Sequence, residues 1–331
     1  MKPNYIKDNP KIYLVAPSFG TTTTPYKERM DKALKNLKKI TNNIIIGPNV
    51  FKQEYPCASA SKEKRAKELI DALKSDADII WSVGGGEIMC QVLELIDFNE
   101  LKDIKPKWYI GYSDNTNMIL PLATHLNMEA IYGPHIPDFY RYPFDYEIKD
   151  TLRMLKGEKI FKGYKSFQLN KTDEIFPKYK MDKRNKLSTY NYDKPFEGKL
   201  LGGCLDCLIT ICGTKVDNVC EFTKNSKEKI IFFIEACEMN PMDIMRGLFQ
   251  LKNANWFNNV SGFILGRSMF YGMEQFKMYD KDAYIESLKY LNVPMIFNCD
   301  FGHIGPTIPI RSNAYAKISV ENNLLKIEYK D

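Results

Sequence analysis

Short apolar runs alternate with longer segments of helical period along the first half of the chain. The apolar runs predict strands at residues 12–16, 43–46, 79–83 and 108–111. Helices are predicted at 26–39 and 61–74, the second because its apolar side chains recur on one face behind a serine that can cap it. Alternation of this kind is typical of β/α units, and we expect residues 1–162 to form an open, mostly parallel α/β lobe.

The hydrophobic pattern changes after this lobe. Residues 163–195 are rich in Lys, Asp and Asn, and we predict that they connect two lobes without adding an element to a core. Apolar runs then return, and the chain ends in two alternating runs at 314–320 and 324–329 joined by a polar turn. We expect residues 196–331 to form a mixed α/β lobe with a β-rich end, with earlier strands at 199–201, 230–234, 262–265 and 294–297.

Composition and charge limit the function classes. At 331 residues, with 44% hydrophobic and 27% charged side chains, the chain has room for two ordinary globular lobes. The first ten residues are polar and no apolar run is long enough to cross a bilayer, so we expect a cytoplasmic protein that contacts no membrane. The eight cysteines lie mostly in apolar stretches, where we expect reduced thiols. The net charge of +6 is spread over helix faces and turns, which argues against nucleic-acid binding.

The sharpest local feature is the run from Trp108 to Thr116, an apolar strand that enters a Gly-x-Ser turn and then a helical segment at 118–126. A turn of this kind lifts Ser113 out of the sheet toward a helix N-terminus, where backbone N–H groups can stabilise an oxyanion. Asn115 replaces the second glycine of the G-x-S-x-G pattern. The residues therefore fit two interpretations, a nucleophile on a sharp turn or a simple helix cap.

A serine nucleophile needs a base, and the chain has three histidines. His125 lies within the helix after Ser113, about three turns away from it. His135 follows a short strand in a proline-rich loop and is a candidate substrate contact. His303 follows the strand predicted at 294–297 in a glycine-containing turn, which favours it as the base.

An imidazole base in turn needs a carboxylate that fixes its tautomer. Glu235 ends a buried-looking strand and requires a partner to offset its desolvation, so we predict that it orients His303. Glu238, three residues later, is the competing carboxylate, expected at a helix N-terminus or facing a substrate.

A run of three glycines at residues 84–86 ends the third predicted strand and lets the backbone approach a ligand closely. In a hydrolase, the N–H group of Gly85 or Gly86 would complete an oxyanion hole with the N–H group of Asp114. In a kinase, the same loop would hold phosphates. Three glycines alone leave both functions open.

Cys204 and Cys207 have the spacing of metal ligands. A second pair of donors at zinc-site spacing is missing from the sequence. We therefore interpret these cysteines as structural.

These motifs occur in the order Ser, Glu, His, and in this order the chain resembles the LD-carboxypeptidase family of serine peptidases. That family includes the murein tetrapeptide carboxypeptidases and the microcin C immunity peptidases. The resemblance covers nearly the whole chain and is carried by residues 15–18, 84–86, 111–114, 133–134, 201–203, 233–235 and 301–303.

The resemblance implies a two-lobed fold with the active site between the lobes, a homodimer, and no metal or other cofactor. It implies that Ser113 attacks the carbonyl carbon, that His303 takes and returns the proton, and that Glu235 holds His303. The oxyanion is expected at the backbone N–H groups named above. The substrate is then a small peptide, and the carboxypeptidase branch removes a terminal D-amino acid from cell-wall peptides.

The long polar connection, with Tyr190, Tyr192 and Phe196, resembles the immunity-peptidase branch, whose loop helps to hold a nucleotide-linked peptide by stacking. No tryptophan lies between Met154 and Leu251, so stacking would fall to tyrosine or phenylalanine. A peptide-nucleotide conjugate is therefore the alternative substrate, and packing of these aromatics within the protein is the alternative to stacking.

A substrate with a free carboxylate calls for a cation in the cleft. Arg267, just after the strand predicted at 262–265, is our first candidate, and Arg311 is the second. The alternative for both is an ion pair within the protein. Glu238 and His135 complete the predicted substrate contacts.

Overall fold

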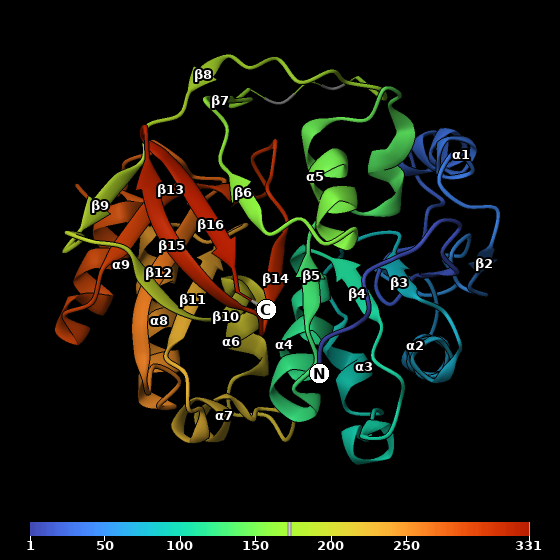
Figure 1. The fold of residues 1–331 in the computed structure, drawn as a ribbon, viewed down its shortest axis with the longest axis horizontal. Coiled ribbons are helices and arrows are strands. Elements are labelled where there is room, and N and C mark those ends of the chain that lie inside the picture. The colour runs from blue at the N-terminus through green and yellow to red at the C-terminus, as the bar shows by residue number, and fades with distance from the viewer. Residues whose placement is uncertain (171, 173, 331) are drawn as a thin grey trace. The chain divides into compact units, whose positions relative to one another are not determined.

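The computed structural model describes residues 1–170, 172 and 174–330, and the chain divides into two compact units. The first unit consists of residues 1–158, 172–178 and 309–311, and the second of residues 159–171, 179–308 and 312–331. The units are not consecutive stretches of chain, because two short pieces of later sequence fold with the first unit. Figure 1 colours most of the first unit blue to green and most of the second yellow to red.

The first unit is built on a sheet of six strands. These are β1 Ile12–Val15, β2 Ile44–Ile46, β3 Ile79–Ser82, β4 Trp108–Gly111, β5 Ala130–Tyr132 and β14 Ile310–Ser312. Their order is β14-β5-β4-β3-β1-β2 (Figure 1), and the pairs from β2 to β5 are parallel. The mostly parallel α/β lobe predicted from the sequence is confirmed.

Helices occupy the connections between these strands. They are α1 Tyr26–Leu37, α2 Lys62–Lys74, α3 Cys90–Leu93, α4 Thr116–Leu126 and α5 Tyr146–Leu155, with 3-10 turns η1 Phe98–Leu101, η2 Ser113–Asn115 and η3 Ile136–Tyr140. Ser61 caps α2 by accepting a hydrogen bond from the Lys64 N–H group, and Leu69 and Leu73 are fully buried on the predicted face. Burial of such faces keeps water from the strands, which are themselves apolar.

The second unit is built on a mixed sheet of eight strands. These are β6 Ile160–Lys162, β9 Ser188–Tyr190, β10 Phe196–Cys204, β11 Ile230–Glu235, β12 Val260–Arg267, β13 Met295–Gly302, β15 Tyr315–Glu321 and β16 Leu324–Tyr329. In the order β6-β16-β15-β10-β11-β12-β13-β9, the pairs from β10 to β13 are parallel and the outer pairs antiparallel (Figure 1). The predicted mixed lobe with a β-rich end is confirmed.

Helices of the second unit follow its parallel strands. They are α6 Leu205–Ile211, α7 Val219–Asn225, α8 Pro241–Asn253 and α9 Asp280–Leu288, with a 3-10 turn η4 Lys289–Leu291. Helix α8 packs against both α6 and α9, and α6 packs against β10. Asn240 starts α8 by accepting hydrogen bonds from two N–H groups of its first turn.

The polar connection contributes to a core, contrary to the sequence prediction. Residues 163–195 contain β7 Ser166–Phe167, which pairs with β8 Lys183–Arg184, and also β9, which pairs with β13. Phe167 is fully buried, and the guanidinium carbon of Arg267 lies 4.3 Å from the centre of its ring. The prediction is wrong because one aromatic side chain in a polar run is enough to fill a site beneath a buried cation.

Gly202 in β10 is a position where we expect a large cost of substitution. Its φ is 145°, a region essentially restricted to glycine, and an added Cβ would lie 1.9 Å from the Phe233 carbonyl oxygen. Gly202→Ala should destabilise the protein by about 3 kcal/mol, because the strand backbone must move.

The matched control is Gly213→Ala. Gly213 has φ 81°, but apart from its two chain neighbours no described residue has an atom within 4 Å of the added Cβ. It should cost only about 1 kcal/mol. Urea unfolding followed by circular dichroism measures both, and equal losses would contradict the steric argument.

Candidate active site

Ser113 stands on a tight turn between a buried strand and a helix. Strand β4 ends at Gly111, η2 begins at Ser113, and α4 follows directly. The backbone of Ser113 has φ 60°, in the left-handed region that residues with a side chain rarely adopt. A strained residue persists only where its surroundings hold it, and such residues concentrate at active sites.

Asn115 holds this turn against the glycine loop at residues 84–86. Its side-chain amide donates to the Gly84 carbonyl oxygen at 2.9 Å, and its amide oxygen accepts a hydrogen bond from the Tyr109 hydroxyl at 2.6 Å. A Cβ at Gly111 would lie 2.6 Å from Cγ of Asn115, so this glycine makes room for the asparagine. The residue that departs from the G-x-S-x-G pattern therefore has a structural role at the same turn.

The Asp114 carboxylate joins three segments at the carboxyl ends of the strands. It accepts hydrogen bonds from the Ser18 hydroxyl, from the Met89 N–H group at 2.9 Å and from the Asn117 amide at 2.8 Å. Burial raises the pKa of Asp114, and the bonds from Ser18 and Met89 lower it in part. The sequence reasoning gave a role to the N–H group of Asp114 and missed the carboxylate. The signal was an acid between an apolar strand and an apolar helical segment.

The glycine loop lies against the Ser113 side chain. The Gly85 carbonyl oxygen accepts a hydrogen bond from the Phe19 N–H group at 3.0 Å. A Cβ at Gly85 would lie 3.2 Å from Ser113 Oγ, and a Cβ at Gly86, where φ is 149°, would lie 2.1 Å from Ser18 Oγ. The backbone of Gly85 approaches Ser113 and that of Gly86 approaches Ser18 closely, because neither residue has a side chain.

His135 supports the serine turn. Its Nε2 accepts a hydrogen bond from the Tyr112 N–H group at 3.3 Å and lies 3.1 Å from Nδ2 of Asn115, and its ring stacks on Tyr112 with centroids 4.4 Å apart. The Asp138 carboxylate accepts the His135 N–H group, and burial raises the pKa of Asp138 to about 6. His135 is only 6% exposed. These contacts favour support of the turn over the substrate contact that we predicted for His135.

Glu235 and His303, predicted as a pair, come together within the second unit. Glu235 is the last residue of β11, and His303 directly follows β13. His303 Nδ1 lies 2.9 Å from Glu235 Oε2, with the glutamate side chain 0% and the histidine side chain 15% exposed. A Cβ at Gly266 would lie 2.7 Å from the Glu235 Cβ, so this glycine of β12 makes room for the carboxylate.

The electrostatics of this pair raise the pKa of the His303 imidazole. Burial lowers the pKa of His303, but the Glu235 carboxylate and a hydrogen bond with Cys237 outweigh it and leave the pKa well above its ordinary value. The carboxylate therefore stabilises the imidazolium, the form that a histidine takes when it accepts a proton.

Asp206 holds the loop that follows Glu235. Its carboxylate accepts hydrogen bonds from the N–H groups of Cys237 at 2.9 Å and Glu238 at 3.0 Å, and from the Cys204 thiol at 3.2 Å. The Glu238 side chain is exposed at the carboxyl end of β11. The sequence reasoning missed Asp206, which lies inside the Cys204-to-Cys207 motif that we interpreted as structural.

The two arginines predicted to bind a substrate carboxylate have internal partners. Arg267 is 0% exposed and its Nη1 lies 2.6 Å from Asp300 Oδ1. Arg311 is 1% exposed, and its Nη2 lies 2.6 Å from Glu129 Oε2. Each arginine therefore forms an ion pair within the protein, which was the alternative to substrate binding. Both pairs are buried and not on the surface.

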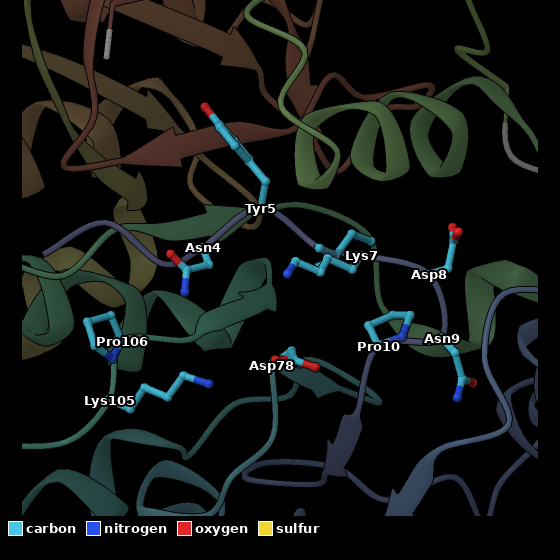
Figure 2. Close-up of a pocket in the computed structure, with 10 residues that line it drawn as sticks. Asn4, Tyr5, Lys7, Asp8, Asn9, Pro10, Asp78, Lys105 and Pro106 are labelled. Atoms are coloured by element: carbon cyan, nitrogen blue, oxygen red, sulfur yellow. The ribbon is translucent and has the colours of Figure 1, made fainter.

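Figure 2 shows a pocket of the first unit at the amino ends of its strands, opposite the end at which Ser113 lies. Its volume is about 260 Å³, and its walls precede the first residues of β1, β3 and β4. Ligands of open α/β sheets bind at the carboxyl ends of the strands, where Ser113 lies, so we assign this pocket no catalytic role. It is lined by residues 4–10, Asp78, Lys105 and Pro106.

The described residues contain neither a cluster of metal ligands nor a membrane-spanning helix. Across residues 1–170, 172 and 174–330, no group of three or more His, Cys, Asp or Glu side chains is arranged to hold a metal ion. In the same part of the chain, no helix combines the length and the apolar character needed to cross a membrane.

The pairing of Glu235 with His303 predicts a change in titration. Because the carboxylate raises the pKa of His303 and burial lowers it, Glu235→Gln should lower this pKa below that of the wild type. The imidazole nitrogen resonances in ¹H–¹⁵N spectra report it across a pH series, with His303→Ala for assignment. Glu228→Gln, just before the amino end of β11, should leave the titration unchanged. An unshifted His303 in Glu235→Gln would rule out the electrostatic role of the carboxylate.

Two domains of known proteins match this chain. Residues 12–133 match the LD-carboxypeptidase N-terminal domain, and residues 197–318 match the LD-carboxypeptidase C-terminal domain. The chain is 30% identical over 318 residues to a Rickettsia conorii protein named a putative carboxypeptidase, which covers 94% of this chain and 88% of that protein. It is 24% identical to the microcin C7 self-immunity protein MccF of Escherichia coli, over 94% of this chain and 91% of that protein.

Solved structures share the fold. The structure of MccF in complex with glutamyl sulfamoyl guanosine has a TM-score of 0.84 at 22% identity and covers 99% of this chain and 98% of its own. A muramoyltetrapeptide carboxypeptidase from Oxalobacter formigenes has a TM-score of 0.72 at 18% identity, with 96% and 99% covered. From the two matched domains and the 30% identity over most of both chains, we conclude that the protein belongs to the LD-carboxypeptidase family.

Proposed function

We propose that this protein is a serine peptidase in which Ser113 is the nucleophile, His303 the general base and Glu235 the residue that orients the histidine. The observation that carries the proposal is the hydrogen bond between the buried Glu235 carboxylate and His303 Nδ1. This bond occupies Nδ1 and leaves Nε2 to exchange protons with a substrate. It also fixes the orientation of the imidazole ring. The strained turn of Ser113 supports its role as nucleophile.

The proposed reaction has two halves. His303 Nε2 takes the proton of the Ser113 hydroxyl as Oγ attacks the carbonyl carbon of an amide bond, and the proton then goes to the departing amine as the C–N bond breaks. Water next attacks the acyl-enzyme, with the same histidine first taking and then returning a proton. The N–H groups of Asp114 and of Gly85 or Gly86 are the proposed donors to the oxyanion.

The proposed substrate is a peptide derived from the cell wall, cut at an amide bond near its C-terminus. The likeness in fold to a muramoyltetrapeptide carboxypeptidase supports this choice. Glu238 is the proposed contact for an amino group of such a peptide, because its carboxylate is exposed three residues after Glu235.

A peptide-nucleotide conjugate is the second candidate, supported by the likeness to MccF, whose solved structure contains glutamyl sulfamoyl guanosine. Two of the three aromatic residues considered for base stacking, Tyr192 and Phe196, have internal contacts instead. The Tyr192 hydroxyl accepts a hydrogen bond from the Val320 N–H group at 3.0 Å, and its ring meets Phe196 edge to face. We therefore rank the cell-wall peptide first. Membership in a carboxypeptidase family gives no support to a phosphate-binding kinase.

A serine-directed phosphonate tests the nucleophile. We expect mass spectrometry to locate one adduct on the peptide that contains Ser113. Ser113→Ala should abolish the adduct and lower the hydrolysis rate by at least about 10³-fold. Ser226→Ala is the matched control, since the Ser226 hydroxyl is bonded to the Glu228 carbonyl oxygen, and it should label like the wild type. Hydrolysis that proceeds without labelling of Ser113 would refute the proposal.

A paired assay tests the substrate. A cell-wall tetrapeptide and a peptidyl-adenylate analogue are incubated separately with the wild type, and the released amino acid or nucleotide is quantified. We expect a higher kcat/KM for the tetrapeptide. The reverse ranking would favour the immunity-peptidase activity with the same three catalytic residues.

A further inference from the structure

Arg267 forms hydrogen bonds on both sides of the turn that carries His303. Its Nη1 donates to Asp300 Oδ1 at 2.6 Å and to the Asn298 carbonyl oxygen at 3.3 Å, both before the histidine in sequence. Its Nη2 donates to two carbonyl oxygens of residues 304–306, at 3.1 and 3.4 Å, just after the histidine. One planar guanidinium therefore fixes the backbone on both sides of His303.

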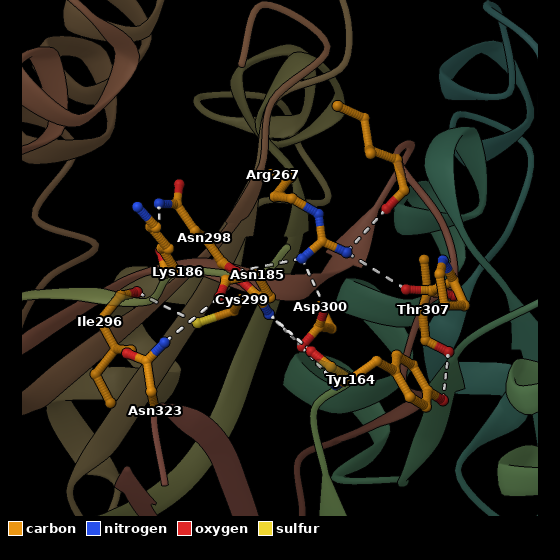
Figure 3. Close-up of polar contacts among 12 residues, drawn as sticks. Tyr164, Asn185, Lys186, Arg267, Ile296, Asn298, Cys299, Asp300, Thr307 and Asn323 are labelled. Carbon is orange, nitrogen blue, oxygen red and sulfur yellow. Dashed lines mark hydrogen bonds and ion pairs between the residues drawn. The ribbon is translucent and has the colours of Figure 1, made fainter. Parts of the chain in front are cut away.

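Asp300 completes this arrangement (Figure 3). Its Oδ2 accepts hydrogen bonds from the Tyr164 N–H group and from the Asn185 side-chain amide, each at 2.9 Å. A Cβ at Gly163 would lie 2.2 Å from this oxygen, so the glycine lets the Tyr164 backbone approach. Both ends of the β7–β8 segment are thereby tied to the ion pair of Asp300 and Arg267.

We propose that Arg267 and Asp300 are positioning residues for His303, acting through the backbone of residues 298–306. This inference rests on the proposed function, in which His303 is the general base. The backbone on either side of His303 determines the orientation of its imidazole ring. Displacement of a catalytic group by about 1 Å can reduce a rate on the order of 100-fold. The ion pair of Arg267 and Asp300 fixes the position of that backbone.

Burial separates this role from the substrate-binding role predicted for Arg267 from the sequence. Both side chains of the pair are 0% exposed, and the guanidinium already has four oxygen acceptors and an aromatic ring over its face. A positioning residue acts on kcat and leaves KM unchanged, whereas a ligand of the substrate carboxylate acts on KM. The two roles therefore have opposite kinetic outcomes.

Arg267→Lys is the sharpest test. Lysine keeps a positive charge beside Asp300, but its single nitrogen cannot span the acceptors on both sides of His303. We expect kcat to fall about 10- to 100-fold with KM within about twofold of the wild type. The resonance of the His303 ring proton that is hydrogen-bonded to Glu235 should shift or broaden, which a loss of stability elsewhere would not cause.

Asp300→Asn is the second variant and decides the question if the lysine variant does not fold. It should lower kcat and alter the His303 resonance in the same direction. Asp217→Asn is its matched control in the same unit, because Asp217 also accepts two N–H groups and the Trp256 indole, at 2.8, 3.1 and 3.0 Å. It should lower the unfolding temperature without changing kcat or the His303 resonance.

Wild-type kcat together with a wild-type His303 resonance in Arg267→Lys would overturn the proposal. A raised KM with unchanged kcat would overturn it in favour of the substrate-binding role. A fall in kcat in Asp217→Asn equal to that in Asp300→Asn would reduce the effect to stability and also overturn it. Failure of the proposed function is recognised separately. Hydrolysis would then survive His303→Ala, while the His303 resonance of Arg267→Lys would still report on the pair.

Discussion

A buried carboxylate must find hydrogen-bond donors, and this constraint organises the carboxyl ends of the strands in both units. In the first unit, Glu68 accepts the N–H groups of Ala16 at 2.8 Å and Asn49 at 2.9 Å. Asp114 accepts donors from the segments after β1 and β3, and both side chains are nearly inaccessible. Burial raises the pKa of each carboxyl group, and the backbone donors lower it in part. The loops after these strands are thus held by hydrogen bonds to the buried carboxyl groups of Glu68 and Asp114.

This network explains how a strained serine turn can persist. The left-handed backbone of Ser113 costs on the order of 1–3 kcal/mol, which the contacts around the turn must offset. Its neighbours on the C-terminal side, Asp114 and Asn115, are both buried and bonded to segments after other strands. His135 holds the residue on the N-terminal side through the Tyr112 N–H group. The turn is therefore fixed at one position before and two positions after the residue whose side chain is the proposed nucleophile.

Periodicity predicted the elements well and the site in part. Four of the six strands of the first sheet and the parallel strands of the second were readable because buried strands are continuous apolar runs. The pairing of Glu235 with His303 was also readable, since a carboxylate at the end of such a strand needs a partner. Positions of Asp206 and Asp300 were not readable, because their donors come from backbone far away in sequence. The same limit concealed the core contribution of Phe167, one apolar residue in a polar run.

The second unit buries two carboxylates near its proposed base, and their partners differ in one chemical respect. Asp300 pairs with Arg267, a cation that keeps its proton at any ordinary pH. Glu235 pairs with His303, whose charge depends on a proton that it can give and take. Of the two partners, only His303 is therefore suited to proton transfer, and the pair of Asp300 and Arg267 holds the backbone around it. In the proposed function, this division gives the proton transfer to His303 and the positioning of its backbone to Arg267.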